Sequence, residues 1–100
     1  MRPYLKCVYK SMKISFDPPK DAANIIKHGI SLRQAADLVW GEAMVWEDNR
    51  MSYGEARMIA LTPIGSRLFV VVFTDRKTER RVISLRKAND REVNNYVSQN

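Results

Sequence analysis

The sequence contains only one cysteine, Cys7, and only one histidine, His28. A single cysteine excludes an internal disulfide, which agrees with a reducing cytoplasm. One histidine and one cysteine far apart in the chain make no ligand set, so we expect neither a metal nor a cofactor. No apolar run approaches the roughly 20 residues of a membrane-spanning helix, and the N-terminus lacks the apolar core and cleavage site of a secretory signal. We therefore expect a cytoplasmic protein without a membrane segment.

Acidic residues are also scarce, with 11 against 17 lysines and arginines, so the net charge is +6. The excess lies in two parts of the chain: residues 1–30 contain six basic and two acidic residues, and residues 66–91 contain eight basic and three acidic residues. A polyanion such as nucleic acid is the natural partner for such a field. A general nucleic-acid binder that relies on this field alone is one candidate, and its affinity would fall steeply with salt.

The first part of the chain predicts two helices in close succession. Asp17 and the two prolines after it are typical of a helix start, and Gly29 of a helix end. Asn24 is expected on the polar side of this helix. The side expected to face the core carries Ala22, Ile25 and Ile26. A second helix is predicted over residues 31–40, with a capping box at its start.

The rest of the chain predicts strands followed by one helix. Residues 1–11 are interpreted as an N-terminal extension or an extra edge strand, and residues 12–100 as a single domain. Strands are expected at residues 13–16, 43–47, 55–62, 67–74 and 80–86. Six consecutive apolar residues at 68–73 predict a central strand that is buried on both faces. The final helix, residues 88–99, has Asn89 or Asp90 as its cap, and its expected inner side carries Val93, Tyr96 and Val97.

These elements predict an α+β fold. Two N-terminal helices are expected to pack on a three- to four-stranded antiparallel sheet that continues into a C-terminal helix. The one hundred residues of the chain suffice for a single hydrophobic core but not for two.

The basic stretch at residues 79–92, ERRVISLRKANDRE, is the strongest functional signal. Strict alternation along a strand predicts one face made of Arg80, Val82, Ser84 and Arg86, and another made of Arg81, Ile83 and Leu85. Ile83 and Leu85 then anchor the strand in the core. The guanidinium groups and the hydroxyl on the other face suit a phosphate, because arginine binds phosphate oxygens with two parallel hydrogen bonds. The alternative is a solvated outer face of a half-buried strand.

Three separated motifs resemble the BrnT family of toxins. FDPPKDAANIIKHGISLRQAADLVW, which begins at Phe16, is similar to the strand, Asp-Pro step and Lys-His-Gly helix end near the start of that family. GEAR at residues 54–57 resembles its Gly-Glu-x-Arg step, and RVISLRKA at residues 81–88 resembles its Arg-Ile-Ile-Ser-x-Arg-x-Ala strand. Arg91, Glu92 and Tyr96 continue the match. The resemblance covers about residues 12–96, although Leu32 stands where family members commonly have an aromatic residue.

The resemblance implies a toxin of a type II toxin-antitoxin system: a small ribonuclease of RelE-like fold that blocks translation by cutting RNA. It implies an antitoxin partner, BrnA, with a ribbon-helix-helix part that binds operator DNA, so the toxin would meet DNA only through the antitoxin. Because that antitoxin fold is built from intertwined chains, a two-plus-two complex is expected.

RNA can be cut without a metal when its own 2′-hydroxyl attacks the phosphate. The reaction needs a base, cations that stabilise the phosphorane and a donor for the leaving 5′-oxygen. Arg86, Arg81 and Arg57 are the candidate cations, Glu55 or His28 is the candidate base, and His28 or Lys27 is the candidate acid. The candidates for substrate binding are Ser84, Arg80 and Lys87.

Each of these roles has a structural alternative. His28 and Lys27 sit where a helix C-terminus favours cations in any case. Glu55 and Arg57, two residues apart on one strand, could pair with each other, and Arg81 could snorkel over the core edge.

Three hypotheses for the function therefore remain open, and the weakest of them is the general nucleic-acid binder described above. The first is a metal-independent RNA endonuclease that an antitoxin neutralises. The second is a non-catalytic module that binds an antitoxin and contributes only to repression of the operon, which the lack of a second histidine favours. Three aromatic residues are candidates for stacking on bases: Trp40, Trp46 and Tyr53. Of these, Trp40 is expected to close the core at the end of the second helix instead.

Overall fold

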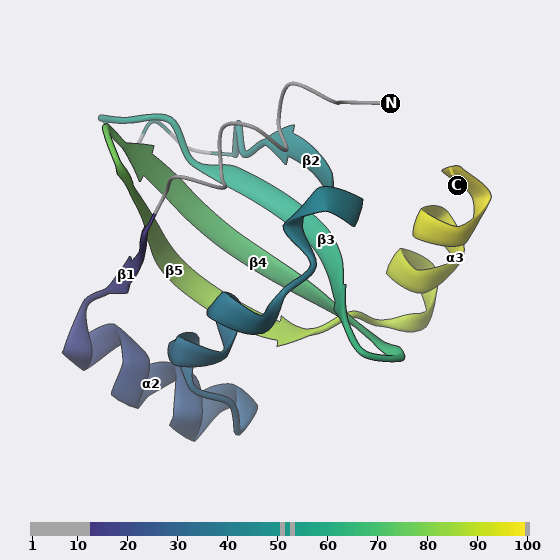
Figure 1. Ribbon diagram of the computed structural model, residues 1–100, viewed down its shortest axis with the longest axis horizontal. Helices are drawn as coiled ribbons and strands as arrows, with labels where there is room; N and C mark the ends of the chain where they lie inside the picture. Colours follow the sequence, from purple (N-terminus) through teal and green to yellow (C-terminus); the bar gives the residue numbers. More distant parts are fainter. Residues whose placement is uncertain (1–12, 51, 53, 100) are drawn as a thin grey trace.

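The computed structural model describes residues 13–50, 52 and 54–99, which form a five-stranded mixed sheet in the order β1-β5-β4-β3-β2 (Figure 1). The strands are β1 (Lys13–Phe16), β2 (Met44–Glu47), β3 (Met58–Ile64), β4 (Arg67–Arg76) and β5 (Glu79–Lys87). The expected α+β class is confirmed, but the expected antiparallel sheet of three to four strands is wrong. β1 pairs in parallel with β5, whereas β2 to β5 form antiparallel pairs.

The predicted central strand is confirmed. β4 pairs with β3 on one side and β5 on the other, and its middle residues are buried. The turn between β3 and β4 consists of Gly65 and Ser66, where Gly65 has a φ of 59° that favours glycine. The predicted N-terminal extension, residues 1–11, lies outside the described residues. None of the helices in the described part of the chain is long and apolar enough to cross a membrane.

Helix α2 (Pro18–His28) has the predicted bounds but not the predicted inner face. It ends at Gly29, whose φ is 72° and whose N–H donates to the Ile25 carbonyl over 2.8 Å. Asn24 is the buried residue of this helix, at 5% exposure, whereas Ile26 is 87% exposed. The predicted placement of Asn24 on the polar side is therefore wrong.

The buried position of Asn24 has a physical cause at the edge of β5. β1 pairs with β5 only as far as Val82, so beyond that point the β5 backbone faces α2. The Asn24 amide completes the ladder there: its Oδ1 accepts from the Leu85 N–H over 3.2 Å, and its Nδ2 donates to the Leu85 carbonyl over 2.8 Å. Nδ2 also donates to the Ile30 carbonyl over 2.9 Å. Hence one side chain joins α2, the sheet and the segment after the helix.

Replacing Asn24 with alanine is expected to lower the free energy of unfolding by about 3–5 kcal/mol. The change leaves three buried backbone groups without partners, and each such group costs roughly 1–3 kcal/mol. Chemical denaturation monitored by circular dichroism measures the change. Asn94→Ala, at an exposed position of the C-terminal helix, is the control and should change the stability by less than about 0.5 kcal/mol. Equal stability of the two variants would contradict the anchoring role of Asn24.

The predicted second helix is a short 3-10 helix, η1 (Leu32–Asp37), followed by a second one, η2 (Trp40–Glu42). The buried residues Leu32, Ala35 and Leu38 recur every three positions, which matches the three residues per turn of a 3-10 helix. The carboxylate that caps its start comes from α2 and not from within a capping box. Asp21 Oδ1 accepts from the Leu32 N–H over 2.8 Å and from the Ser31 hydroxyl over 2.9 Å.

A β-bulge in β5 changes which side chains share a face. Val72 pairs with Ser84 and Phe73 with Val82, so Ile83 is an extra residue in β5. The core face of β5 therefore consists of Arg80, Val82 and Leu85, and the opposite face carries Arg81, Ile83, Ser84 and Arg86. Strict alternation predicted Arg80 and Val82 on the outer face and Ile83 in the core, and both predictions are wrong. The prediction that Leu85 anchors the strand in the core is confirmed.

Arg80 is thus a buried residue of the core side, with 5% exposure. Its guanidinium donates to Asp75 through Nε over 2.7 Å and Nη2 over 2.8 Å. The same group lies 4.6 Å from the Trp40 ring centroid and 4.3 Å from that of Phe73, and the two rings meet edge to face at 5.2 Å. The predicted placement of Arg80 on a substrate-binding face is therefore wrong, whereas Trp40 packs against the core as expected.

Arg80→Met is expected to destabilise the protein by about 1–3 kcal/mol, because it removes a buried ion pair and two cation–π contacts. The neighbouring substitution Arg81→Met, on the other face of the same strand, is the matched control and should cost less than about 0.5 kcal/mol. Thermal and denaturant unfolding of both variants tests the difference. A larger loss of stability in Arg81→Met than in Arg80→Met would contradict the placement of Arg80 in the core and Arg81 on the opposite face.

Candidate functional site

A cavity of about 400 Å³ lies on the face of the sheet opposite the core. Its apolar floor consists of Ile59, Val70 and Val72, which alternate with the core residues of β3 and β4. Its polar and aromatic lining consists of Lys27, His28, Trp46, Arg50, Ser84, Arg86 and Glu92. Four of the predicted site residues therefore meet in this cavity, which we call the Arg86 cavity: Lys27 and His28 from the end of α2, and Ser84 and Arg86 from β5.

The register of the sheet explains how β5 places Ser84 and Arg86 in the cavity. Ser84 lies opposite Val72 and Arg86 lies opposite Val70, so both side chains project over the floor. Without the bulge, Arg81 and Ser84 would point to opposite faces. Within the described residues, no three side chains of histidine, cysteine, aspartate or glutamate lie close enough together to hold a metal ion.

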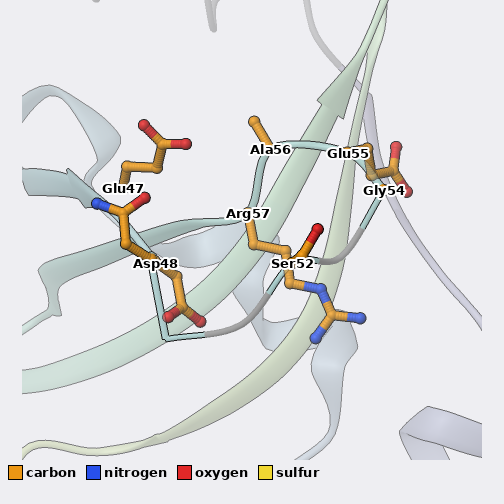
Figure 2. A pocket seen from close by; sticks show the side chains of 8 residues that line it. Glu47, Asp48, Ser52, Gly54, Glu55, Ala56 and Arg57 are labelled. Carbon is orange, nitrogen blue, oxygen red and sulfur yellow. The ribbon is translucent and has the colours of Figure 1, made fainter.

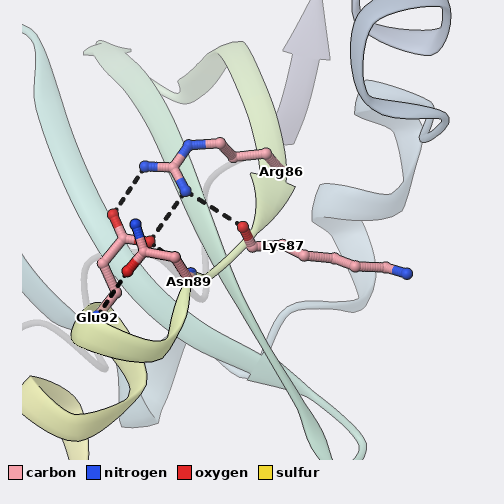
Figure 3. Close-up of polar contacts among 4 residues, drawn as sticks. All are labelled: Arg86, Lys87, Asn89 and Glu92. Carbon is pink, nitrogen blue, oxygen red and sulfur yellow. Dashed lines mark hydrogen bonds and ion pairs between the residues drawn. The ribbon is translucent and has the colours of Figure 1, made fainter.

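Arg86 is held at one end by a carboxylate. Its Nη1 donates to Glu92 Oε1 over 2.9 Å and its Nη2 donates to Glu92 Oε2 over 2.7 Å (Figure 3). Nη1 also donates to the Lys87 carbonyl over 3.2 Å. A guanidinium has five N–H donors, so these contacts leave the Nε–H and one Nη2–H, which form a second fork along one edge of the group. Arg86 can therefore bind a phosphate through that edge without releasing Glu92.

Glu92 is a residue of the cavity that the sequence analysis did not assign to the site. It belongs to α3 (Asp90–Gln99) and forms a reciprocal capping box with Asn89. The Asn89 N–H donates to Glu92 Oε1, and the Glu92 N–H donates to Asn89 Oδ1, both over 2.8 Å. The three-residue spacing of Asn and Glu was the available signal. The hydrogen bonds from Arg86 lower the pKa of Glu92, and the same contacts raise the pKa of Arg86.

Few contacts join α3 to the rest of the described chain. None of its residues is buried, and Figure 1 shows the helix standing clear of the sheet. Val97, which was expected on the inner side, is 64% exposed, so that prediction is wrong. Tyr96 donates its hydroxyl to the Glu42 carbonyl over 2.7 Å. The contact with Arg86 is therefore one of the few that connect α3 to the rest of the fold.

Arg50 and Trp46 also line the Arg86 cavity and were not among the predicted catalytic residues. Arg50 donates to the buried Asp48 through Nε over 2.8 Å and Nη2 over 2.7 Å. Trp46, a predicted stacking residue, is 40% exposed on the edge strand β2. Trp46 lines the cavity, but its contact with a base stays a prediction, and Tyr53 lies outside the described residues.

Three other predicted site residues lie in a separate cavity. Glu55, Arg57 and Arg81 line a space of about 200 Å³ together with Lys20, Thr74 and Arg76. Glu55 accepts from Arg76 Nη2 over 2.9 Å and from Nε over 3.4 Å, and this contact lowers the pKa of Glu55. A carboxylate with a lowered pKa is a poor base near neutral pH.

Glu55 forms hydrogen bonds with Arg76, which lower its pKa most, and the nearby charge of Arg57 lowers that pKa further. In Figure 2 the side chains of Glu55 and Arg57 point away from each other, along the loop between β2 and β3. This loop encloses a further cavity of about 400 Å³ that Glu47 and Asp48 also line. Lys87, a predicted substrate-binding residue, extends away from the Arg86 guanidinium in Figure 3.

Glu92→Gln is expected to lower the free energy of unfolding by about 1 kcal/mol at pH 7, and the loss should shrink at low pH. Because the pKa of Glu92 is lowered in the folded state, its ion pair stabilises fully above the ordinary carboxyl value of 4.5 and is lost as the pH falls through the lower folded value. Denaturant unfolding at several pH values measures this. The exposed Glu47→Gln is the control, and a Glu92→Gln effect that does not vary with pH would refute the ion pair.

Comparisons with known proteins indicate the family of this chain. A family model described as the ribonuclease toxin BrnT of type II toxin-antitoxin systems matches residues 16–92. The 1.1 Å crystal structure of the Brucella abortus ribonuclease toxin BrnT is similar to this chain, with a TM-score of 0.60 and 31% sequence identity. The match covers 79% of this chain and 99% of the Brucella chain. Among curated protein sequences, none matches significantly.

Proposed function

Because the chain belongs to the BrnT family of ribonuclease toxins of type II toxin-antitoxin systems, we propose that it is a metal-independent RNA endonuclease that inhibits translation. The observation that carries the proposal is the Arg86 cavity. It gathers Arg86, Ser84, Lys27 and His28 above an apolar floor, and Glu92 fixes one end of Arg86 while another edge of the guanidinium stays available.

The first chemical step is the attack of the 2′-oxygen on the adjacent phosphate. His28 takes the proton from the 2′-hydroxyl, since Glu55 lies in the other cavity and is paired with Arg76. Histidine is the side chain whose ordinary pKa suits proton transfer near pH 7. As the new oxygen–phosphorus bond forms, negative charge grows on the non-bridging oxygens.

The second element of the mechanism is the stabilisation of that charge. The open Nε–Nη2 edge of Arg86 donates two parallel hydrogen bonds to the phosphorane oxygens, and Ser84 donates a third from the same strand. Lys27 gives a proton to the leaving 5′-oxygen as the phosphorus–oxygen bond breaks. The products are a 2′,3′-cyclic phosphate and a 5′-hydroxyl, and every proton is accounted for within the cavity.

The apolar floor has a role in binding. Ile59, Val70 and Val72 accept the ribose or the face of a base, and Trp46 is placed at the rim to stack on the neighbouring base. Removal of water from this floor strengthens the hydrogen bonds of Arg86, because the local dielectric constant falls. Arg80 has no part in this scheme, since it is buried on the core side.

The family also implies an antitoxin. We propose a BrnA-like ribbon-helix-helix antitoxin in a two-plus-two complex, with operator DNA bound only by the antitoxin, in the cytoplasm. An acidic or helical antitoxin segment over the Arg86 cavity would silence the enzyme by occlusion, because the cavity lies on the face of the sheet opposite the core. The RelE-like character of the fold stays a prediction of the resemblance.

The proposal predicts that Arg86→Ala lowers the rate of RNA cleavage by roughly 10²–10³, the usual effect of removing one preorganised donor. Purified protein is incubated with a defined RNA in EDTA, and the product ends are identified. Arg67→Ala, in an exposed position next to the β3–β4 turn, is the control and should cleave like the wild type. Products of the wild type should carry 2′,3′-cyclic phosphate ends.

Two outcomes would contradict the proposal in different ways. Equal cleavage rates for Arg86→Ala and the wild type would contradict the role of Arg86 in cleavage. Failure of the wild type to cleave free RNA, followed by failure in the presence of translating ribosomes, would leave the non-catalytic antitoxin-binding module as the function. Cleavage only with ribosomes would keep the nuclease and make it ribosome-dependent.

A further inference from the structure

The cavity that contains Arg81 concentrates positive charge without using it in the reaction proposed above. Four cationic side chains, Lys20, Arg57, Arg76 and Arg81, line it beside the two anionic side chains of Asp17 and Glu55. They come from α2, the loop before β3, β4 and β5. We call this space the Arg81 cavity. Such a convergence of like charges is unfavourable in the isolated protein, so it suits a site that an anion completes.

Two features make this charge available to a ligand. Glu55 is committed to Arg76 through two hydrogen bonds, and the lowered pKa of Glu55 keeps that pair ionised. Arg81 and Lys20, by contrast, form no ion pair within the described residues. Thr74 also lines the cavity, although its hydroxyl donates to the Ala56 carbonyl over 2.6 Å.

The Arg81 cavity adjoins the Arg86 cavity on the same face of the sheet. Ile83 lines the Arg81 cavity, and its neighbour Ser84 lines the Arg86 cavity. Because the bulge adds one residue between Arg81 and Arg86, their Cα atoms are separated by about four strand steps, or roughly 13 Å. Long arginine side chains at this separation can reach different phosphates of one strand.

We propose that the Arg81 cavity is a second phosphate subsite, which binds an RNA strand beside the phosphate that Arg86 holds. The inference rests on the proposed ribonuclease function and extends it to the path of the substrate. The strand runs across the open face of β5 from the Arg86 cavity to the Arg81 cavity, and Ile83 lies under the segment between them. The substrate is therefore a single-stranded RNA of several nucleotides and not a dinucleotide.

Two measurements test the subsite. The first compares kcat/KM for a dinucleotide and for a 12-nucleotide RNA with the same cleavage step, in wild type and in Arg81→Met. The loss in Arg81→Met should be at least roughly tenfold larger for the long RNA. The second measures binding of an uncleavable 2′-deoxy 12-mer by fluorescence anisotropy. Arg81→Met should weaken binding roughly tenfold and reduce the salt slope by about one, whereas Arg67→Met should bind like the wild type.

The outcomes separate the subsite from the nuclease itself. Equal losses for both substrates would place Arg81 in the reaction centre and overturn the proposal. Unchanged binding in Arg81→Met would overturn it as well, whether or not the protein cleaves RNA. If the wild type never cleaves RNA, the binding measurement alone decides: weaker binding and a lower salt slope in Arg81→Met support the subsite even though the nuclease proposal fails.

Discussion

The arrangement of the site depends on one extra residue in β5. The bulge at Ile83 shifts the alternation of that strand by one position. Arg81 therefore shares a face with Ser84 and Arg86, and Arg80 lies on the core side. There, Asp75 and two aromatic rings surround Arg80. A regular strand cannot place both Arg81 and Arg86 on the same face, because they are an odd number of positions, five, apart in the sequence.

Two polar side chains then fix the groups that the bulge has placed. Asn24 holds α2 against the β5 backbone at Leu85, next to Arg86, and so brings the end of the helix with Lys27 and His28 to the Arg86 cavity. Glu92 holds the guanidinium of Arg86 and at the same time caps α3. Asn24 is buried and Glu92 is half-buried. Their hydrogen bonds fix the positions of the site residues before a substrate binds, as a preorganised site requires.

Much of the fold follows from the sequence alone. The six apolar residues of the central strand and the proline-marked start of α2 with its end at Gly29 are local signals, and each was predicted. The cap of α3 was narrowed to Asn89 or Asp90, and the structure shows Asn89. The inner face of α2 was not predicted. Asn24 is buried because β1 stops pairing with β5 at Val82, and the Asn24 amide bonds the β5 backbone beyond that point. The bulge at Ile83 leaves no local signal either, so alternation misplaced Arg80. Seven of the nine predicted site residues divide into two cavities that only the tertiary structure separates, whereas Arg80 and Lys87 line neither.

The central claim is that the open Nε–Nη2 edge of Arg86 holds the reacting phosphate while Glu92 keeps the other end. NMR spectra of the arginine Nε–H groups, recorded during titration with an uncleavable 2′-deoxy oligonucleotide, test it most directly. We predict that the Arg86 Nε–H signal shifts on binding and that the same shift is lost in Glu92→Gln, where the group is no longer held. An Arg86 signal that stays in place while the oligonucleotide binds would contradict the account.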